Sequence, residues 1–196
     1  MKVIYFLMML CIVVLLSGCA VLETHHTQTP QVNFTNKSTV QLPTPAALNL
    51  HHTVMQILTA HTMKKTVTTQ VVLEMTSQHI ILVALGAFGG QLFSIDYNGK
   101  IIKSKRLPIK HGGVGIQQTL LDVILVYGSA HVLQDMLRGN NIKLTIKPLS
   151  RVFTLNGRPI IKIQYQYKNP WRGIVHLENV VQHYRIDIKT ISVDKK

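Results

Sequence analysis

A period-two alternation of apolar and polar residues runs from residue 53 almost to the C-terminus and constrains the fold of this 196-residue chain more than any other feature. In residues 65–75, alternate positions read Val, Thr, Val, Leu and Met, whereas the positions between them are mostly Thr, Gln and Glu. The pairs Asn98-Gly99 and Asn156-Gly157 separate further alternating runs and favour hairpin turns. The pattern predicts a mainly β fold of the α+β class with one long antiparallel sheet of roughly nine or ten strands.

One segment, at about residues 114–138, departs from this alternation. Its apolar residues recur at helical spacing, and Gly128-Ser129 predicts a break into two helices. Two arrangements satisfy the apolar face of so long a sheet. The sheet curls into a half-open barrel with the helical insertion as a lid over an apolar cavity, or it packs as an ordinary α+β layer without a cavity.

The N-terminal region contains Lys2, then an apolar run over residues 3–16, and it ends in the sequence Leu16-Ser17-Gly18-Cys19. The run is too short to cross a bilayer comfortably, and it predicts a signal peptide over residues 1–18. The sequence Leu16-Ser17-Gly18-Cys19 resembles the bacterial lipobox. That resemblance implies cleavage before Cys19, a covalent lipid on its thiol and, with Ala20 next, a lipid-anchored position on the periplasmic face of the outer membrane.

Residues 19–52 are rich in Thr, Gln, Asn and Pro and show little hydrophobic periodicity, which predicts a lipidated tether ahead of a single domain at residues 53–196. The pairs His25-His26 and His51-His52 have no Cys, Asp or Glu beside them at ligand spacing. We therefore expect no metal site and no cofactor apart from the lipid on Cys19.

Basic residues dominate the charge of the chain, with 21 Lys and Arg against 8 Asp and Glu. In a periplasmic lipoprotein this field suits anionic lipid head groups and not nucleic acid. The candidates for contact with an anionic surface are clustered in one short segment: Lys100, Lys103, Lys105, Arg106 and Lys110. The alternative is a charged edge strand that prevents aggregation.

Catalytic signals are weak. The eight carboxylates show no spacing of an acid/base pair, and Gly112-Gly113-Val114-Gly115 lacks the Lys-Ser/Thr of a phosphate loop. The sequence therefore predicts a binding protein and not an enzyme. The candidates for lining a cargo cavity, which would otherwise be ordinary core residues, are Phe88, Phe93, Leu121, Leu125, Tyr165, Trp171 and Tyr184.

Several short motifs carry a resemblance to a known family: residues 85–93 (LGAFGGQLF), Asn156-Gly157-Arg158, residues 170–173 (PWRG), Tyr184-Arg185-Ile186, and Asp122 and Tyr127 in the helical segment. Over residues 53–192 the chain resembles an uncharacterised family of bacterial lipoproteins, DUF3261, often encoded with aryl polyene pigment biosynthesis genes. Gln91 stands where that family commonly has arginine. The family is in turn similar to the LolA/LolB lipoprotein-localisation factors, which implies a half-open barrel and a hydrophobic cargo site.

These observations lead to one expectation and two alternatives. We expect an outer-membrane lipoprotein that faces the periplasm, binds an acyl or aryl polyene lipid and assists its delivery to the membrane. The first alternative is a structural or assembly lipoprotein that docks on a partner complex, whose identity the sequence does not indicate. The second is an enzyme acting on a polyene ester, such as a thioesterase.

Overall fold

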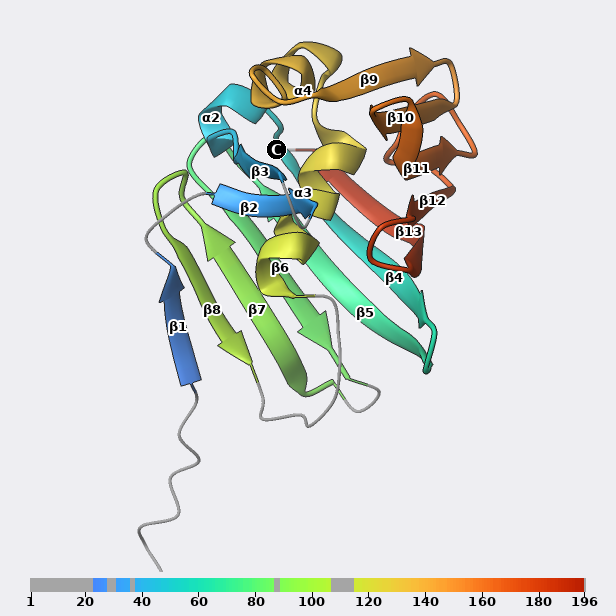
Figure 1. Cartoon of the computed structure of the whole chain (residues 1–196). Coiled ribbons are helices and arrows are strands. Elements are labelled where there is room, and N and C mark those ends of the chain that lie inside the picture. Colours follow the sequence, from blue (N-terminus) through green and yellow to red (C-terminus); the bar gives the residue numbers. More distant parts are fainter. Residues whose placement is uncertain (1–22, 28–30, 36–37, 87–88, 107–114, 196) are drawn as a thin grey trace, which may run out of the picture.

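The computed structural model describes residues 23–27, 31–35, 38–86, 89–106 and 115–195. Its main element is an eleven-stranded antiparallel sheet with the strand order β1-β8-β7-β6-β5-β4-β13-β12-β11-β10-β9 (Figure 1). The strands of this sheet are β1 (Glu23–Thr27), β4 (His52–Thr62), β5 (Thr66–Met75), β6 (Ile80–Leu85), β7 (Gln91–Tyr97), β8 (Ile102–Arg106), β9 (Ile142–Lys147), β10 (Ser150–Leu155), β11 (Arg158–Tyr165), β12 (Ile174–Asn179) and β13 (Tyr184–Lys195).

Two meanders build the sheet. Strands β4 to β8 form the first and β9 to β13 the second, and the pairing of β13 with β4 joins them, with Ile188 opposite Leu58. The chain between the meanders carries the helices α3 (Ile116–Tyr127) and α4 (Ala130–Met136). The predicted mainly β fold with a long antiparallel sheet and a helical insertion is confirmed, and the helices break at Gly128-Ser129 as expected.

The sheet is curled and α3 lies across its concave face, with α4 beside β9 at one end (Figure 1). In the described part of the chain, the outermost strands β1 and β9 each pair with a single neighbour, so the sheet does not close on itself. The register explains which side chains turn inward. Val71 and Gln56 face each other on the concave side, whereas Val72 and Met55 face each other on the convex side.

The prediction of a tether over residues 19–52 is wrong for most of that segment. Residues 31–48 form the hairpin β2 (Gln31–Thr35) and β3 (Ser38–Gln41) and the short helix α2 (Pro45–Leu48). This unit packs on the domain because it buries five apolar side chains: Val32, Phe34, Val40, Leu42 and Leu48. The folded domain therefore begins well before residue 53.

Strand β1 also lies within the predicted tether. It pairs with β8 along its full length, from Glu23 opposite Arg106 to Thr27 opposite Ile102. Strand β8 is consequently not an edge strand, which removes the alternative reading of its lysines as guards of an exposed edge. Residues 1–22, which include Cys19, lie outside the described part of the chain.

None of the described helices is long and apolar enough to span a membrane.

Candidate functional site

The concave face of the sheet is an apolar surface made by alternate residues of successive strands. Buried side chains that point to this face include Val71, Leu73 and Met75 of β5, Ile80, Leu82 and Ala84 of β6, and Val175 and Leu177 of β12. Such a surface must be covered, because leaving it in water would cost about 25 cal/mol for each Å². In this structure the cover is α3.

Helix α3 is buried around most of its circumference. Nine of its twelve residues are buried: Gln118 and the run from Leu120 to Tyr127. A surface helix normally buries a single stripe. Helix α3 departs from that pattern because the sheet covers one side and the hairpin β2–β3 crosses its other side (Figure 1). The helix therefore fills the interior of the curled sheet, and we call it the plug.

A cluster of polar side chains lies between the N-terminal half of α3 and the sheet. The Tyr184 hydroxyl donates to Asp122 Oδ2 at 2.7 Å, and Gln118 Nε2 donates to Asp122 Oδ1 at 3.0 Å. Two further hydrogen bonds extend the cluster: Asn179 Nδ2 donates to the Tyr184 hydroxyl oxygen at 3.2 Å, and Gln182 Nε2 donates to Gln118 Oε1 at 2.9 Å. The cluster thus links α3 to β12, to β13 and to the turn between them.

Burial dominates the electrostatics of this cluster. It raises the pKa of Asp122 from 3.8 to about 7, although the hydrogen bonds from Tyr184 and Gln118 act in the opposite direction. Burial, with the neighbouring Asp122 carboxyl, also raises the pKa of the Tyr184 hydroxyl. Both described partners of Asp122 are neutral side chains. The site therefore favours the uncharged carboxyl group of Asp122 below about pH 7.

The C-terminal end of α3 is held differently, by a cation and a hydroxyl. Arg151 Nη1 of β10 lies 2.8 Å from the carbonyl oxygen of Leu125, 3.2 Å from that of Val126 and 2.8 Å from that of Gly128. The Tyr165 hydroxyl also donates to the Val126 oxygen, at 2.8 Å. The last carbonyls of a helix have no partner within the helix and carry partial negative charge, so a cation there is stabilising.

Aromatic stacking adds to this attachment. The rings of Tyr127, the last residue of α3, and Trp171 are stacked with centroids 3.9 Å apart and planes 6° from parallel. Gln56 Nε2 of β4 donates to the Tyr127 hydroxyl oxygen at 2.6 Å. The C-terminal end of α3 is thus attached to β4, β10, β11 and the segment between β11 and β12.

The structure places six of the seven predicted cargo-binding residues, and Phe88 lies outside the described residues. Leu121 and Leu125 are fully buried on α3, and Trp171 and Tyr184 are buried beside it. Tyr165 and Phe93 are half-buried and pack against the same core. Five of the six, all except Phe93, therefore lie at the interface of α3 and the sheet. Tyr165 also lines a shallow hollow of about 470 Å³ at the turn between β9 and β10.

A separate hollow of about 740 Å³ lies outside the concave face. It is bounded by the segment from β3 to α2 and by α4, with Leu42, Ala47, Val132 and Met136 among its lining residues. None of the six described cargo-binding candidates lines it.

The structure places three of the five predicted basic contact residues. Lys103 and Lys105 are exposed on the convex side of β8, whereas Lys100 is exposed in the turn at the start of that strand. Lys110 and the side chain of Arg106 lie outside the described part. Only Lys103 and Lys105 are therefore placed side by side.

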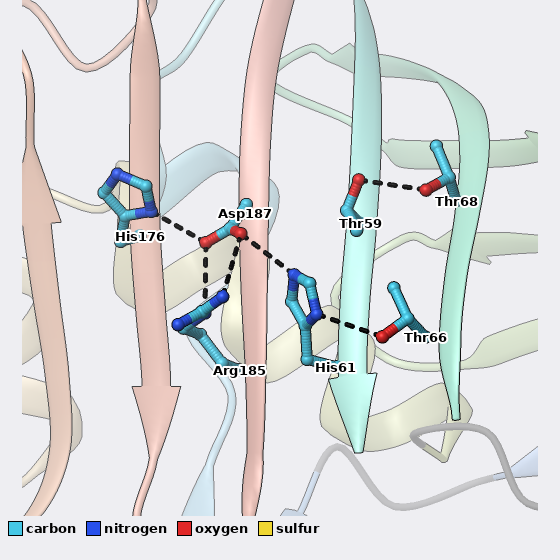
Figure 2. A network of polar contacts seen from close by, with 7 residues as sticks. All are labelled: Thr59, His61, Thr66, Thr68, His176, Arg185 and Asp187. Carbon is cyan, nitrogen blue, oxygen red and sulfur yellow. Dashed lines mark hydrogen bonds and ion pairs between the residues drawn. The ribbon is translucent and has the colours of Figure 1, made fainter. Parts of the chain in front are cut away.

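The convex face carries a polar network centred on Asp187 of β13 (Figure 2). Its carboxylate lies 2.7 Å from His176 Nδ1, 3.0 Å from His61 Nε2 and 3.4 Å from Arg185 Nε. Burial alone would raise the pKa of Asp187, but the hydrogen bonds from His176 and His61 and the Arg185 charge outweigh it and lower the pKa. In the part of the chain that the structure describes, no group of His, Cys, Asp and Glu has the arrangement of a metal site.

Sequence reasoning missed Arg151, Gln118, Asn179 and Gln182. Arg151 did give a signal, since it shares an alternating face with Phe153 and Leu155, and a charge on the buried face of a strand needs a partner. Asp122 gave a similar signal as the one carboxylate within an apolar helical run.

Comparisons with known proteins complete these observations. Residues 53–192 match the model of a family described as a protein of unknown function, DUF3261. No curated protein sequence matches the chain. Among solved structures, a LolA superfamily protein from Nitrosomonas europaea is similar, with a TM-score of 0.44 and 6% identity over 78% of this chain and 90% of that chain. Function must therefore be argued from the residues of this chain.

Proposed function

The chain belongs to the DUF3261 family, whose function is unknown, and from its structure we propose a lipid-anchored carrier that holds an acyl chain where α3 now lies. The proposal includes delivery of this cargo, an acyl or aryl polyene lipid, to the outer membrane on its periplasmic face. The observation that carries it is the burial of a separate apolar helix on the concave face of the sheet.

Helix α3 is suited to displacement because a glycine flanks each of its ends. Gly115 is the N-cap of α3 and provides no side-chain hydrogen bond, and Gly128 follows its last residue. An acyl chain in place of α3 would stabilise the complex by about 0.8 kcal/mol for each methylene that it buries. This gain offsets the free-energy cost of exposing the apolar side chains of the displaced helix. The hairpin β2–β3 covers α3, so it must lift with the helix.

The position of β1 supports an orientation on the membrane. Three residues separate Cys19 from Glu23, where β1 begins, so a lipid on Cys19 would hold that end of the sheet within about 14 Å of the bilayer. We call it the anchor end, and the tip of the β4–β5 hairpin lies there as well (Figure 1). At that tip Met63 is 86% exposed and Lys64 follows it. An exposed apolar side chain beside a cation suits the surface of an anionic bilayer.

A specific observation also favours the second candidate, a lipoprotein that docks on a protein partner. Met55, Val72 and Val83 form a cross-strand row on the convex face, and Ile57 and Ile191 nearby are 36% and 51% exposed. An exposed aliphatic surface of this kind is typical of protein contacts.

Native mass spectrometry distinguishes the two candidates. The chain from residue 19, with Cys19→Ser to prevent acylation, is exported behind a cleavable secretory signal peptide and purified from the native bacterium without detergent. We expect a stoichiometric acyl or polyene species bound to it, which lipid extraction then identifies. A lipid-free protein that also fails to bind a fluorescent fatty acid would reject the carrier and favour docking. A chain shortened to residues 53–196 is unsuitable because it would lack the core residues of the hairpin β2–β3 and of α2.

A further inference from the structure

We propose that the Asp122 carboxyl occupies the position of the ligand's acyl carbonyl group, so that the cargo is a long-chain carboxylic acid or its ester bound head-first to Tyr184. This inference rests on the proposed function and specifies the chemical class of its ligand.

The polar cluster around Asp122 is divided between α3 and the sheet. Asp122 and Gln118 belong to α3, whereas Tyr184 and Asn179 belong to the sheet. In the closed structure the Tyr184 hydroxyl donates to Asp122 Oδ2 at 2.7 Å, and Asn179 Nδ2 donates to that hydroxyl at 3.2 Å. The sheet therefore presents an ordered donor whose partner is a carboxyl oxygen.

Displacement of α3 affects the sheet side of this cluster. When the helix leaves, Tyr184 loses its acceptor, and a ligand that fills the vacated apolar space also excludes water. Leaving a buried hydroxyl unpaired costs about 1–3 kcal/mol. A ligand that supplies an oxygen acceptor at this point avoids that loss, whereas a pure hydrocarbon does not.

The charge of the acceptor is also restricted. The described partners of Asp122 are a hydroxyl and an amide, so no described cation balances a negative group there. A phosphate head group in that position would bring a buried charge, which is expensive without a counter-charge. A neutral acyl carbonyl, in a protonated acid or an ester, needs only the hydrogen bond.

The geometry of the closed state matches a ligand with such a head. Asp122 is preceded on α3 by the fully buried residues Leu120 and Leu121. A carboxyl group with apolar bulk beside it is the arrangement that an acyl compound would bring. Helix α3 thus acts as an internal substitute for the cargo.

The test compares three probes of equal length: pyrene-labelled dodecanoic acid, its methyl ester and dodecylpyrene. Their dissociation constants are measured by fluorescence titration at one fixed pH with the chain from residue 19 carrying Cys19→Ser. We expect the acid, the ester or both to bind about tenfold more tightly than the hydrocarbon, the value of one hydrogen bond. A preference between acid and ester would identify the form of the cargo.

Two variants locate the contact. Tyr184→Phe should bind all three probes with the affinity of the hydrocarbon, whereas Tyr97→Phe, which alters another buried tyrosine of the concave face, should keep the preference. Equal binding of the three probes to the parent chain, or a preference that survives Tyr184→Phe, would overturn the inference and leave the carrier intact. Binding of no probe at all would reject both. The comparison among probes on the parent chain needs no variant to fold.

Discussion

The two ends of α3 are attached to the sheet by different chemistry. At the C-terminal end, the Arg151 cation and the Tyr165 hydroxyl bind backbone carbonyls, and Trp171 stacks on Tyr127. At the N-terminal end, Gly115 gives no side-chain cap, and the attachment is a cluster of side chains around Asp122. Because backbone carbonyls persist in every state of the helix whereas side-chain pairs can be exchanged, the C-terminal end suits a pivot and the N-terminal end a releasable contact.

The largest expected effect concerns Asp122 and pH. Its pKa is raised to about 7 in the folded protein, so the stability present below about pH 4 decreases as the pH rises and levels off above about pH 7. Asp122→Asn does not titrate, and its free energy of unfolding relative to the parent should therefore increase by up to about 4 kcal/mol across this range. Urea unfolding at a series of pH values measures the difference.

The matched control is Asp135→Asn, because the Asp135 side chain on α4 is 41% exposed. Its free energy of unfolding should follow that of the parent to within about 1 kcal/mol over this pH range, because its ion pairs with Arg138 and His131 lie at the surface. If Asp122→Asn also followed the parent, the assignment of a buried, largely neutral carboxyl to the N-terminal contact would be wrong.

The pivot is tested by Arg151→Met, which keeps the apolar stem of the side chain and removes the donors to three carbonyls. We expect a loss of about 3 kcal/mol in the free energy of unfolding, since the buried carbonyls of Leu125 and Gly128 lose this donor while that of Val126 keeps the Tyr165 hydroxyl. Arg185→Met is the comparison, as that side chain is 54% exposed and should change stability by less than about 1 kcal/mol. Similar small losses in both variants would remove the distinction between the two ends.

Glycine substitutions compare the two ends directly. A Cβ atom at Gly128 would lie 2.7 Å from the Ile124 carbonyl oxygen and 3.1 Å from Leu133 Cδ2, whereas one at Gly115 would meet no atom of the described residues within 4 Å. Gly128→Ala should therefore cost about 2 kcal/mol, and Gly115→Ala should stay within about 0.5 kcal/mol. Thermal unfolding followed by circular dichroism is sufficient, and equal effects at the two glycines would contradict the structure.

The smallest effect is expected on the convex face, far from α3. The pKa of Asp187 is lowered, so its contribution is present above its ordinary value of 3.8 and is lost as the pH falls below that value. Asp187→Asn should reduce stability at neutral pH by less than about 1 kcal/mol, because the partners are largely exposed. Acid unfolding curves should converge with those of the parent at low pH, and ligand binding should not change.

The sequence predicted the sheet well because alternation and turn residues are local signals. At Asn156-Gly157 both residues have positive φ, 51° and 77°, as a two-residue hairpin requires. At Asn98-Gly99 only Gly99 does, with φ of 89°, and the Asn98 side chain instead accepts from the amides of Lys100 and Ile101. The same dipeptide thus predicted both hairpins but not the length of the turn at Asn98-Gly99.

The N-terminal segment was misjudged because its elements are short and rich in Thr and Asn. A usable signal was present at Thr44-Pro45, since Thr44 is the N-cap of α2 and accepts from the Ala47 amide, with Pro45 in the first turn. The pairing of β1 with β8 has no local signal, because it depends on contacts across about 80 residues of sequence.

The interior could be predicted only in part. The run over residues 120–127 is apolar on nearly every side apart from Asp122, which is typical of a fully buried helix. Periodicity alone does not say whether such a helix covers a cavity or fills it. The filled interior depends on side-chain packing, and the Tyr184 hydroxyl that binds Asp122 comes from a residue 62 positions away.

Thiol labelling on the two halves of α3 tests most directly whether this helix is the exchangeable plug. In the Cys19→Ser chain, which then has no other cysteine after residue 18, Leu121→Cys and Val126→Cys each place one buried thiol on the helix. We expect a saturating fatty-acid probe to speed maleimide labelling at position 121 and to leave position 126 slow. Bound probe with both positions still protected would contradict the account, because the ligand would then lie elsewhere.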